Sequence, residues 1–241
     1  MRRFASASQR LRTTVTNVTT VDIYQYFQQV IATSDRPVVC EIGAAYGDDT
    51  TRLVQLTDAI CRQKGVDSFE YYAFEPDPRN ISALKRSAVR DQFTLIEAAV
   101  GSRNERATFR MSDGGRPDGQ GHHTLSGSLK EPIRHFEVWP HITFQDTATV
   151  RVLRLDDAMS IYSFDHIDFI WCDVQGAEDM VIDGGINALK RTRYFYTEFY
   201  DIEVYSGQLP LAEIHRRLPG RWRIVERYPT DVLFENLEPW V

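Results

Sequence analysis

Cysteine is scarce in this sequence. Its 241 residues include three cysteines, Cys40, Cys61 and Cys172, which are odd in number and widely spaced. Small domains that depend on disulfides carry a dense, even set of cysteines, so this count excludes a disulfide scaffold. It favours a reducing compartment, and we expect the protein to be cytoplasmic.

Long apolar runs and an excess of positive charge are also missing. No hydrophobic stretch approaches the roughly 20 residues that cross a bilayer, so we expect no membrane partner. The chain has 28 Lys and Arg against 34 Asp and Glu, a net charge of −6. This balance argues against a broad nucleic-acid surface, although a local basic strip is compatible with it.

Acidic residues are absent before Asp22. Residues 1–20 carry four arginines and many hydroxyl side chains. This composition predicts a solvated polar arm. It also resembles a transit peptide, so a targeting role stays open.

The chain does contain enough apolar material for one hydrophobic core. Hydrophobic residues make up 42% of it, which suits a single domain over residues 21–241. Residues 21–34 place apolar side chains at three- and four-residue spacing, the pattern of an amphipathic helix. Five glycines fall between residues 112 and 130. We therefore expect an irregular insertion over about residues 112–145 that is either disordered or a lid.

Strand-like and helix-like segments alternate along the rest of the chain. Alternation of this kind predicts an α/β fold with a mainly parallel, doubly wound sheet that helices cover on both faces. A closing hairpin around Pro229 and Thr230 adds an antiparallel strand. Ligands of such sheets lie beyond the carboxyl ends of the strands. Five strand ends therefore hold the candidate site: residues 41–49, 75–77, 98–102, 173–178 and 198–201.

The first of these strand ends, "VVCEIGAAYGDD", indicates the ligand. A P-loop needs a Lys-Ser/Thr pair after its glycines, and this turn has none. A dinucleotide site needs glycine where this chain has Ala45 and Asp48, and the aspartate would repel a pyrophosphate. S-Adenosylmethionine (SAM) has no phosphate and carries a net positive charge. Gly43 and Gly47 let the turn fold against its amino-acid half, and Glu41 and Asp48 can meet its cationic groups.

A second acid supports this interpretation. Glu75 ends the second strand, where a carboxylate can accept hydrogen bonds from both ribose hydroxyls. Asp77 is more simply the N-cap of the next helix, with Pro78 at the first helical position. Glu41 and Glu75 each end an apolar strand, which a purely structural role does not explain.

Together these segments resemble the class I SAM-dependent methyltransferases, and more narrowly the FkbM family. The resemblance covers about residues 37–237. It is carried by "VVCEIGAAYGDDT", "AFEPDPRN", "LIEAAVGS", "LRLDD", "IDFIWCDVQGAEDMVIDGG" and "DVLFEN". It implies a Rossmann-like, seven-stranded sheet and O-methylation, often of a sugar or polyketide hydroxyl, without an obligatory metal.

The resemblance also implies roles for individual residues. Cofactor-binding positions match Glu41, Gly43, Ala45, Gly47 and Asp48 in the first motif, Glu75 and Pro76 at the ribose and adenosine, Ala99 and Val100 near the adenine, and Asp173 at the end of the fourth strand. The family commonly has glutamate where this chain has Gln175. That departure puts in doubt any proton-accepting or metal-binding role of this position.

Methyl transfer to a hydroxyl requires alignment with the sulfonium methyl and a group that accepts the hydroxyl proton. We name three catalytic candidates. Asp173 lies nearest the expected reacting centre, and its alternative role is to orient the SAM ammonium. Glu198 follows aromatic residues suited to a sugar-like acceptor, and its alternative is a structural ion pair. His123 contributes only if the glycine-rich insertion folds over the acceptor. No metal site is expected.

The sequence thus predicts a SAM-dependent O-methyltransferase that acts on a small glycosidic, sugar or polyketide-like acceptor. Two alternatives stay open. A nucleic-acid or protein methyltransferase would need a basic groove beside Asp173. A catalytically inactive SAM-binding module is favoured by Gln175. No pattern in the sequence encodes the acceptor or the oligomeric state.

Overall fold

The computed structural model describes residues 21–115 and 123–238, so the predicted arm over residues 1–20 lies outside the described part of the chain. Seven strands form the central sheet in the order β3-β2-β1-β7-β8-β10-β9. They are β1 (Val38–Ile42), β2 (Glu70–Phe74), β3 (Thr94–Ile96), β7 (Ile167–Cys172), β8 (Thr192–Glu198), β9 (Trp222–Arg227) and β10 (Asp231–Asn236). The first five pair in parallel, whereas β10 is antiparallel to β8 and β9. The predicted α/β fold with its closing antiparallel hairpin is confirmed.

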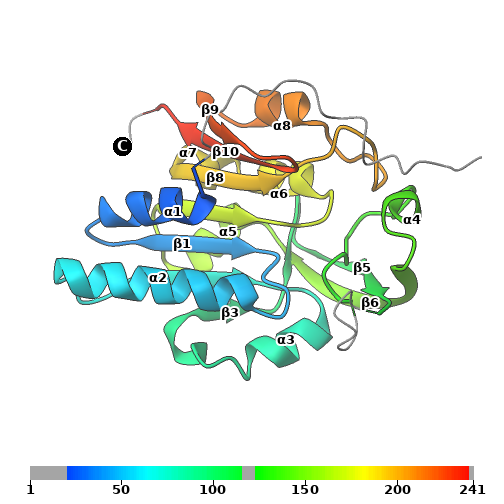
Figure 1. Ribbon diagram of the computed structural model, residues 1–241, viewed down its shortest axis with the longest axis horizontal. Coiled ribbons are helices and arrows are strands. Elements are labelled where there is room, and N and C mark those ends of the chain that lie inside the picture. The colour runs from blue at the N-terminus through cyan, green and yellow to red at the C-terminus, as the bar shows by residue number, and fades with distance from the viewer. Residues whose placement is uncertain (1–20, 116–122, 239–241) are drawn as a thin grey trace, which may run out of the picture.

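Helices cover both faces of this sheet (Figure 1). One face carries α1 (Ile23–Ala32), α2 (Asp48–Lys64) and α3 (Pro78–Leu84), and the other carries α5 (Leu155–Tyr162), α6 (Glu178–Gly184), α7 (Ile186–Lys190) and α8 (Leu211–Arg217). Successive side chains of a strand point to opposite faces. In β1, Val38 and Cys40 therefore join one hydrophobic core and Val39 joins the other. The whole strand is buried because both faces are covered.

The helix α1 lies within the segment where the apolar spacing predicts a helix. Asp22 caps it by accepting a hydrogen bond of 2.8 Å from the backbone N–H of Tyr24. Its apolar stripe, which includes Phe27, packs against α2 and β7. Full burial of one such side chain contributes about 1.5–3 kcal/mol. Packing of this stripe fixes α1 beside the first turn of α2. Among the described helices, none is long and apolar enough to span a bilayer.

A second sheet of three strands has the order β4-β6-β5. It comprises β4 (Ala99–Val100), β5 (Glu105–Asp113) and β6 (Thr143–Leu153), and the chain between β5 and β6 holds the short helix α4 (His135–Val138). In Figure 1 this sheet and α4 stand on the side to which the central parallel strands point. The glycine-rich insertion is therefore the long connection of an antiparallel pair.

The segment "FTLIEAAVG" (residues 93–101) has the nearly continuous apolar pattern of a single buried strand, but it forms two strands. The segment forms β3 in the central sheet and β4 in the small sheet. The backbone N–H of Ala98 donates to the carbonyl of Ile96 at 2.8 Å, which is a three-residue turn. Because the residues on both sides are apolar, the turn leaves no signal in the hydrophobic pattern.

Candidate active site

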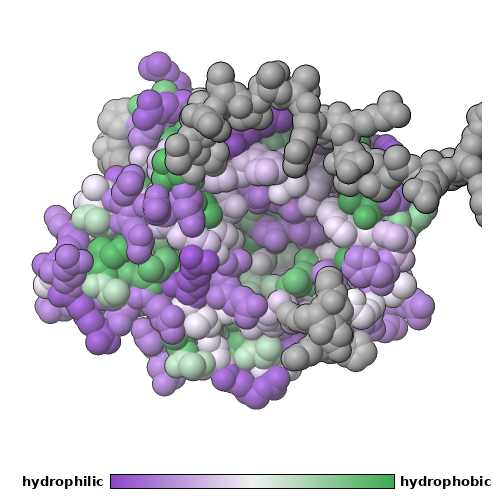
Figure 2. All heavy atoms as spheres, viewed as in Figure 1, coloured by the Kyte–Doolittle hydropathy of each residue, from purple (hydrophilic) through white to green (hydrophobic). Residues whose placement is uncertain are grey.

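A cleft of about 480 Å³ lies at the carboxyl ends of β1, β2, β7 and β8. The strand order reverses between β1 and β7, which is the place where doubly wound sheets bind ligands. All five strand ends identified in the sequence contribute lining residues. In a space-filling view this face is hollowed near its centre, and hydrophilic side chains surround the hollow (Figure 2).

Most of the predicted site residues line this cleft. They are Glu41, Gly43, Ala45, Asp48, Glu75, Pro76, Ala99, Val100, His123, Asp173 and Glu198. Gly47 differs from these, because it lies at the N-cap of α2 with φ +96° and a β-carbon there would lie 2.8 Å from the Leu84 side chain. The absence of a side chain at Gly47 thus allows α2 and α3 to approach closely. Contact of Gly47 with a ligand stays a prediction.

The glycine turn after β1 brings two strand ends together. Gly43 has φ +92°, a conformation that glycine adopts without strain. The backbone N–H groups of Gly43 and Ala44 both donate to the Phe74 carbonyl at 3.0 Å. The turn therefore folds over the end of β2, and its next residue, Ala45, reaches Glu75.

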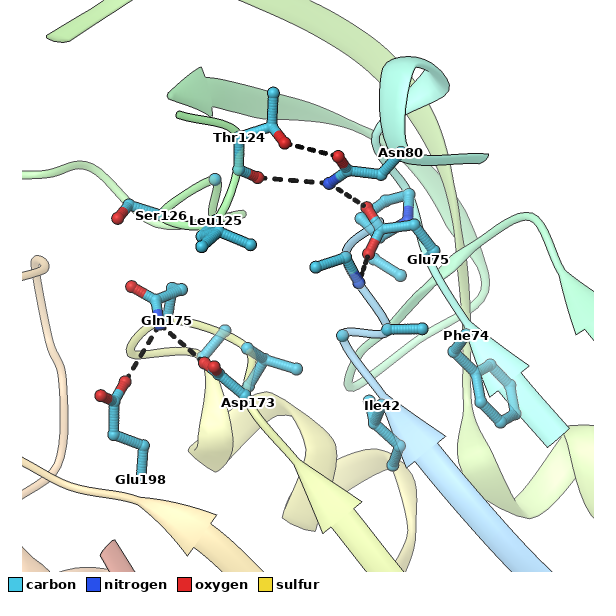
Figure 3. Close-up of a pocket in the computed structure, with 18 of the residues that line it drawn as sticks. Ile42, Phe74, Glu75, Asn80, Thr124, Leu125, Ser126, Asp173, Gln175 and Glu198 are labelled. Carbon is cyan, nitrogen blue, oxygen red and sulfur yellow. Dashed lines mark hydrogen bonds between the residues drawn. The ribbon is translucent and has the colours of Figure 1, made fainter. Parts of the chain in front are cut away.

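Glu75 is buried at the floor of the cleft (Figure 3). Its Oε2 accepts the backbone N–H of Ala45 at 2.7 Å, and its Oε1 accepts that of Asp77 at 2.8 Å. Burial raises the pKa of Glu75 to about 8, although these hydrogen bonds oppose the shift. A carboxylate has about four acceptor positions. Asn80 Nδ2 adds a third, longer hydrogen bond to Oε1 at 3.4 Å. Glu75 is thus held by two backbone groups and by Asn80, and it retains about one acceptor position for a ligand hydroxyl.

Glu41 and Asp48 contribute negative charge in different ways. Glu41 is buried beneath the turn, and its Oε2 accepts the hydroxyls of Thr50 at 2.6 Å and Tyr71 at 2.9 Å. Burial raises the pKa of Glu41 to about 8. Asp48 is exposed in the first turn of α2. Asp48 can therefore contact a ligand directly, whereas in the ligand-free protein Glu41 becomes charged only above neutral pH.

The opposite half of the cleft holds a pair of acids that one amide joins (Figure 3). The Nε2 of Gln175 donates to Asp173 Oδ1 at 2.6 Å and to Glu198 Oε2 at 3.0 Å. Tyr200 donates its hydroxyl to Glu198 Oε1 at 2.5 Å. Burial raises the pKa of both carboxyls. Neighbouring acids add to the rise: Asp231 and Asp49 at Asp173, and Asp173, Glu178 and Asp231 at Glu198. Although Asp173 lies deep in the molecule, its side chain is open to the cleft.

The described part of the insertion closes this half of the cleft. The cleft is lined here by six residues of the insertion: His123, Thr124, Leu125, Ser126, Trp139 and His141. The Trp139 ring lies 5.6 Å from the Tyr200 ring at 81°. Asn80 ties the insertion to the Glu75 end of the cleft. Its Nδ2 donates to the Thr124 carbonyl at 3.2 Å and to Glu75 Oε1 at 3.4 Å, and its Oδ1 accepts the Thr124 hydroxyl at 2.6 Å.

Several of these lining residues could not be identified from the sequence. Asn80 ends the quoted segment "AFEPDPRN", but no role was assigned to it. No local motif marks the others, which come from different loops: Thr124, Trp139, His141 and Tyr200. Within residues 21–115 and 123–238, no group of three or more His, Cys, Asp or Glu side chains is placed to hold a metal ion.

The strand order, the glycine turn at the point of reversal and the acid at the end of the second strand define a class I methyltransferase. The Asp173–Glu198 pair at the other end of the same cleft is an arrangement that can accept a proton from a bound hydroxyl.

The chain belongs to the FkbM family. The model of the Methyltransferase FkbM domain matches residues 41–229. The chain is 37% identical over 217 residues to "2-O-methyltransferase NoeI" of Sinorhizobium fredii (strain NBRC 101917 / NGR234), a match that covers 87% of this chain and 84% of that protein. The protein is thus a methyltransferase.

Two solved methyltransferase structures match the chain at low sequence identity. Methyltransferase FkbM from Methylobacillus flagellatus KT is 17% identical with a TM-score of 0.48, over 88% of this chain and 50% of that chain. This chain therefore spans half the length of that protein. An rRNA methylase from Streptococcus thermophilus is 12% identical with a TM-score of 0.45, over 90% of this chain and 98% of that chain.

Proposed function

We propose that the protein is a SAM-dependent O-methyltransferase that acts on a hydroxyl of a small glycosidic, sugar or polyketide-like acceptor. The observation that carries this proposal is that one continuous cleft contains Glu75 at one end and the Asp173–Glu198 pair at the other. A cofactor and an acceptor placed at these ends would meet between β1 and β7. Positioning of this kind is worth about 7–11 kcal/mol in a bimolecular reaction.

The first half of the cleft fits SAM. Glu75 is available to the ribose hydroxyls, and Ala99 and Val100 offer an apolar wall to the adenine. Gly43 keeps the turn free of a side chain, and Asp48 can meet a cationic group. When bound, SAM supplies an electrophilic methyl group on a sulfonium. Such a cation lowers the pKa of the acidic side chains around it and so favours their charged forms, whereas these side chains would repel the phosphates of a nucleotide.

The second half fits a hydroxyl acceptor. Asp173 is the more exposed of the two acids, so an acceptor hydroxyl can reach it. The raised pKa of both carboxyls makes them stronger bases than free carboxylates, which suits general-base catalysis near neutral pH. The name of the relative NoeI, a 2-O-methyltransferase, agrees with an oxygen acceptor.

The charge of the cleft argues for a neutral or cationic acceptor. Six of the described residues that line the cleft are Asp or Glu, and no described lining residue is Lys or Arg. A phosphate would be repelled there without a compensating cation, which opposes the nucleic-acid alternative. Trp139 and Tyr200 offer aromatic faces on which the C–H groups of a sugar, or a flat apolar part of another acceptor, can pack.

Two measurements test the proposal. Calorimetry with SAM and with its demethylated product measures cofactor binding, and we expect affinities in the micromolar range. Methyl transfer from labelled SAM is then assayed on sugars, glycosides, phenols and polyketide alcohols, with RNA and protein as comparisons. We expect transfer to one class of small hydroxylated acceptor. Binding without transfer to any of them would support the inactive module that Gln175 favours, and absence of binding would refute the proposal.

A further inference from the structure

Gln175 has an unusual backbone conformation at the edge of the acceptor half of the cleft. Its φ is +53°, and Gly176 follows with φ +88°. Residues other than glycine rarely adopt a positive φ, and such backbone strain persists only where surrounding contacts hold it. Ser128 provides one of these contacts, since its hydroxyl donates to the Gln175 carbonyl at 2.8 Å. The turn after β7 is thus held in the conformation that places Gln175 between the two acids.

The orientation of the Gln175 amide follows from its neighbours. Its nitrogen lies 2.6 Å from Asp173 Oδ1 and 3.0 Å from Glu198 Oε2, and its two N–H bonds satisfy one acid each. The reverse orientation would place an amide oxygen against two acceptors. On the other side, the Tyr205 hydroxyl lies 3.1 Å from Gln175 Oε1 and 2.7 Å from the Ser126 carbonyl, and it can donate to either.

We propose that Gln175 is a positioning residue for methyl transfer: its amide nitrogen holds the Asp173 and Glu198 carboxylates together as a single proton-accepting pair. This inference rests on the proposed function. As the acceptor oxygen bonds to the methyl carbon and the carbon–sulfur bond breaks, the electron pair of that bond stays on sulfur. The hydroxyl proton passes to the acid pair, which holds it until it exchanges with solvent.

An amide suits this position better than a third acid. Each N–H donated to a carboxylate favours its charged form, whereas a like charge disfavours it. A carboxylate at residue 175 would lie within hydrogen-bond distance of both acids, so protons would be retained to higher pH. The amide therefore allows the pair to lose its proton near neutral pH.

The test compares Gln175→Glu, Gln175→Met and a matched surface control. Gln63→Glu adds the same charge at an exposed position near the end of α2 that lies farthest from its glycine turn. The quantity measured is the pH dependence of kcat/KM for the acceptor found in the transfer assay, together with the KM for SAM and the melting temperature. Gln175→Met keeps the length of the side chain and removes both donors.

We expect Gln175→Glu to shift the acidic limb of the pH profile to higher pH by about one unit or more. At pH 7 the activity should therefore fall about tenfold. Gln175→Met should shift the acidic limb in the same direction by a smaller amount, because this substitution removes two hydrogen-bond donors without adding a charge. The KM for SAM should stay within about threefold, and Gln63→Glu should match the wild type. A purely structural role would change the melting temperature and leave the limb in place.

The outcomes separate the two proposals. If the wild type transfers methyl groups and both Gln175 variants keep its acidic limb, the role of Gln175 is refuted while the proposed function stands. The same holds if the loss of activity only follows a loss of SAM binding. If the wild type binds SAM and transfers nothing, the proposed function fails, and this inference fails with it.

Discussion

A β-carbon on Gly43 would lie 1.8 Å from the carbonyl oxygen of Asp173. The two residues end the neighbouring strands β1 and β7, and Asp173 donates its N–H to the Ile42 carbonyl at 2.9 Å. The closeness of these two backbones brings the glycine turn after β1 next to the residue that carries one acid of the pair. Glycine is thus required at position 43 for two reasons: its φ is positive, and the Asp173 carbonyl leaves no room for a β-carbon.

Replacement of Gly43 by alanine should therefore destabilise the protein strongly. Backbone strain of about 1–3 kcal/mol adds to a clash with backbone atoms that cannot move aside, so we expect a loss of roughly 3 kcal/mol or more in the free energy of unfolding. Denaturant titration measures it. Gly65→Ala is the matched control, because Gly65 also has a positive φ, of +70°, but has no atom within 4 Å of its β-carbon. We expect about 1 kcal/mol there. Equal losses would show that the contact with Asp173 is unimportant.

Glu75→Gln should weaken SAM binding. The change removes the charge and places an amide N–H₂ against one of the two backbone donors that now hold the carboxylate. Loss of charge-assisted hydrogen bonds to the ribose should raise the dissociation constant about tenfold or more. Calorimetry measures this effect. Glu97→Gln, one strand away and paired with Lys85 on the surface, should leave the affinity unchanged. An unaffected affinity in Glu75→Gln would remove the ribose role of this residue.

The ligand-free protein should become less stable as the pH rises from about 4.5 to 8. Burial raises the pKa of both Glu41 and Glu75 from 4.5 to about 8. Between these values the folded state binds more protons than the unfolded state, so stability falls with increasing pH, by at most about 1.4 kcal/mol per pH unit for each group. Below pH 4.5 this effect vanishes because both states are protonated.

Melting temperatures of the ligand-free protein between pH 5 and 9 measure this decline. Glu41→Gln should make it shallower, since glutamine has no charge to bury and its oxygen can still accept from Thr50 and Tyr71. Glu105→Gln is the control at an exposed position of β5. A Glu41→Gln profile parallel to that of the wild type would mean that Glu41 keeps an ordinary pKa.

Trp139→Ala should impair acceptor binding and leave SAM binding intact. The Trp139 ring lines the acceptor half beside Tyr200, and loss of a large aromatic contact should raise the acceptor KM about tenfold or more. Steady-state kinetics with each substrate in turn separates the two effects. Phe136→Ala tests the same short helix at a side chain that is 62% exposed and lines no part of the cleft. A matching loss in both variants would indicate a general effect on α4.

The sequence predicted the features that depend on neighbours along the chain. The alternation of strand-like and helix-like segments indicated a doubly wound sheet, and the rule that ligands bind at strand ends placed Glu75, Asp173 and Glu198 at one edge. Asp77 caps α3 by accepting the Arg79 N–H at 2.8 Å, as its position before Pro78 predicted. Each of these inferences needs only a few consecutive residues.

Other features could not be predicted because they depend on contacts between distant segments. The division of "FTLIEAAVG" between two sheets follows from pairing of β4 with β6, which lies some fifty residues further along the chain. The sequence likewise gave no reason to place Trp139 opposite Tyr200. Side chains that meet across loops leave no periodic signal.

Gln175 illustrates the division most clearly. In the sequence it is a departure from the family pattern and an argument against catalysis. In the structure it bridges Asp173 and Glu198, and Glu198 lies 23 residues further along the chain. The order of residues determined which acids stand at strand ends, because strand ends follow from local pattern. The parallel pairing of β7 with β8 decided that one amide reaches both acids, because only the folded sheet brings those two ends within hydrogen-bonding distance.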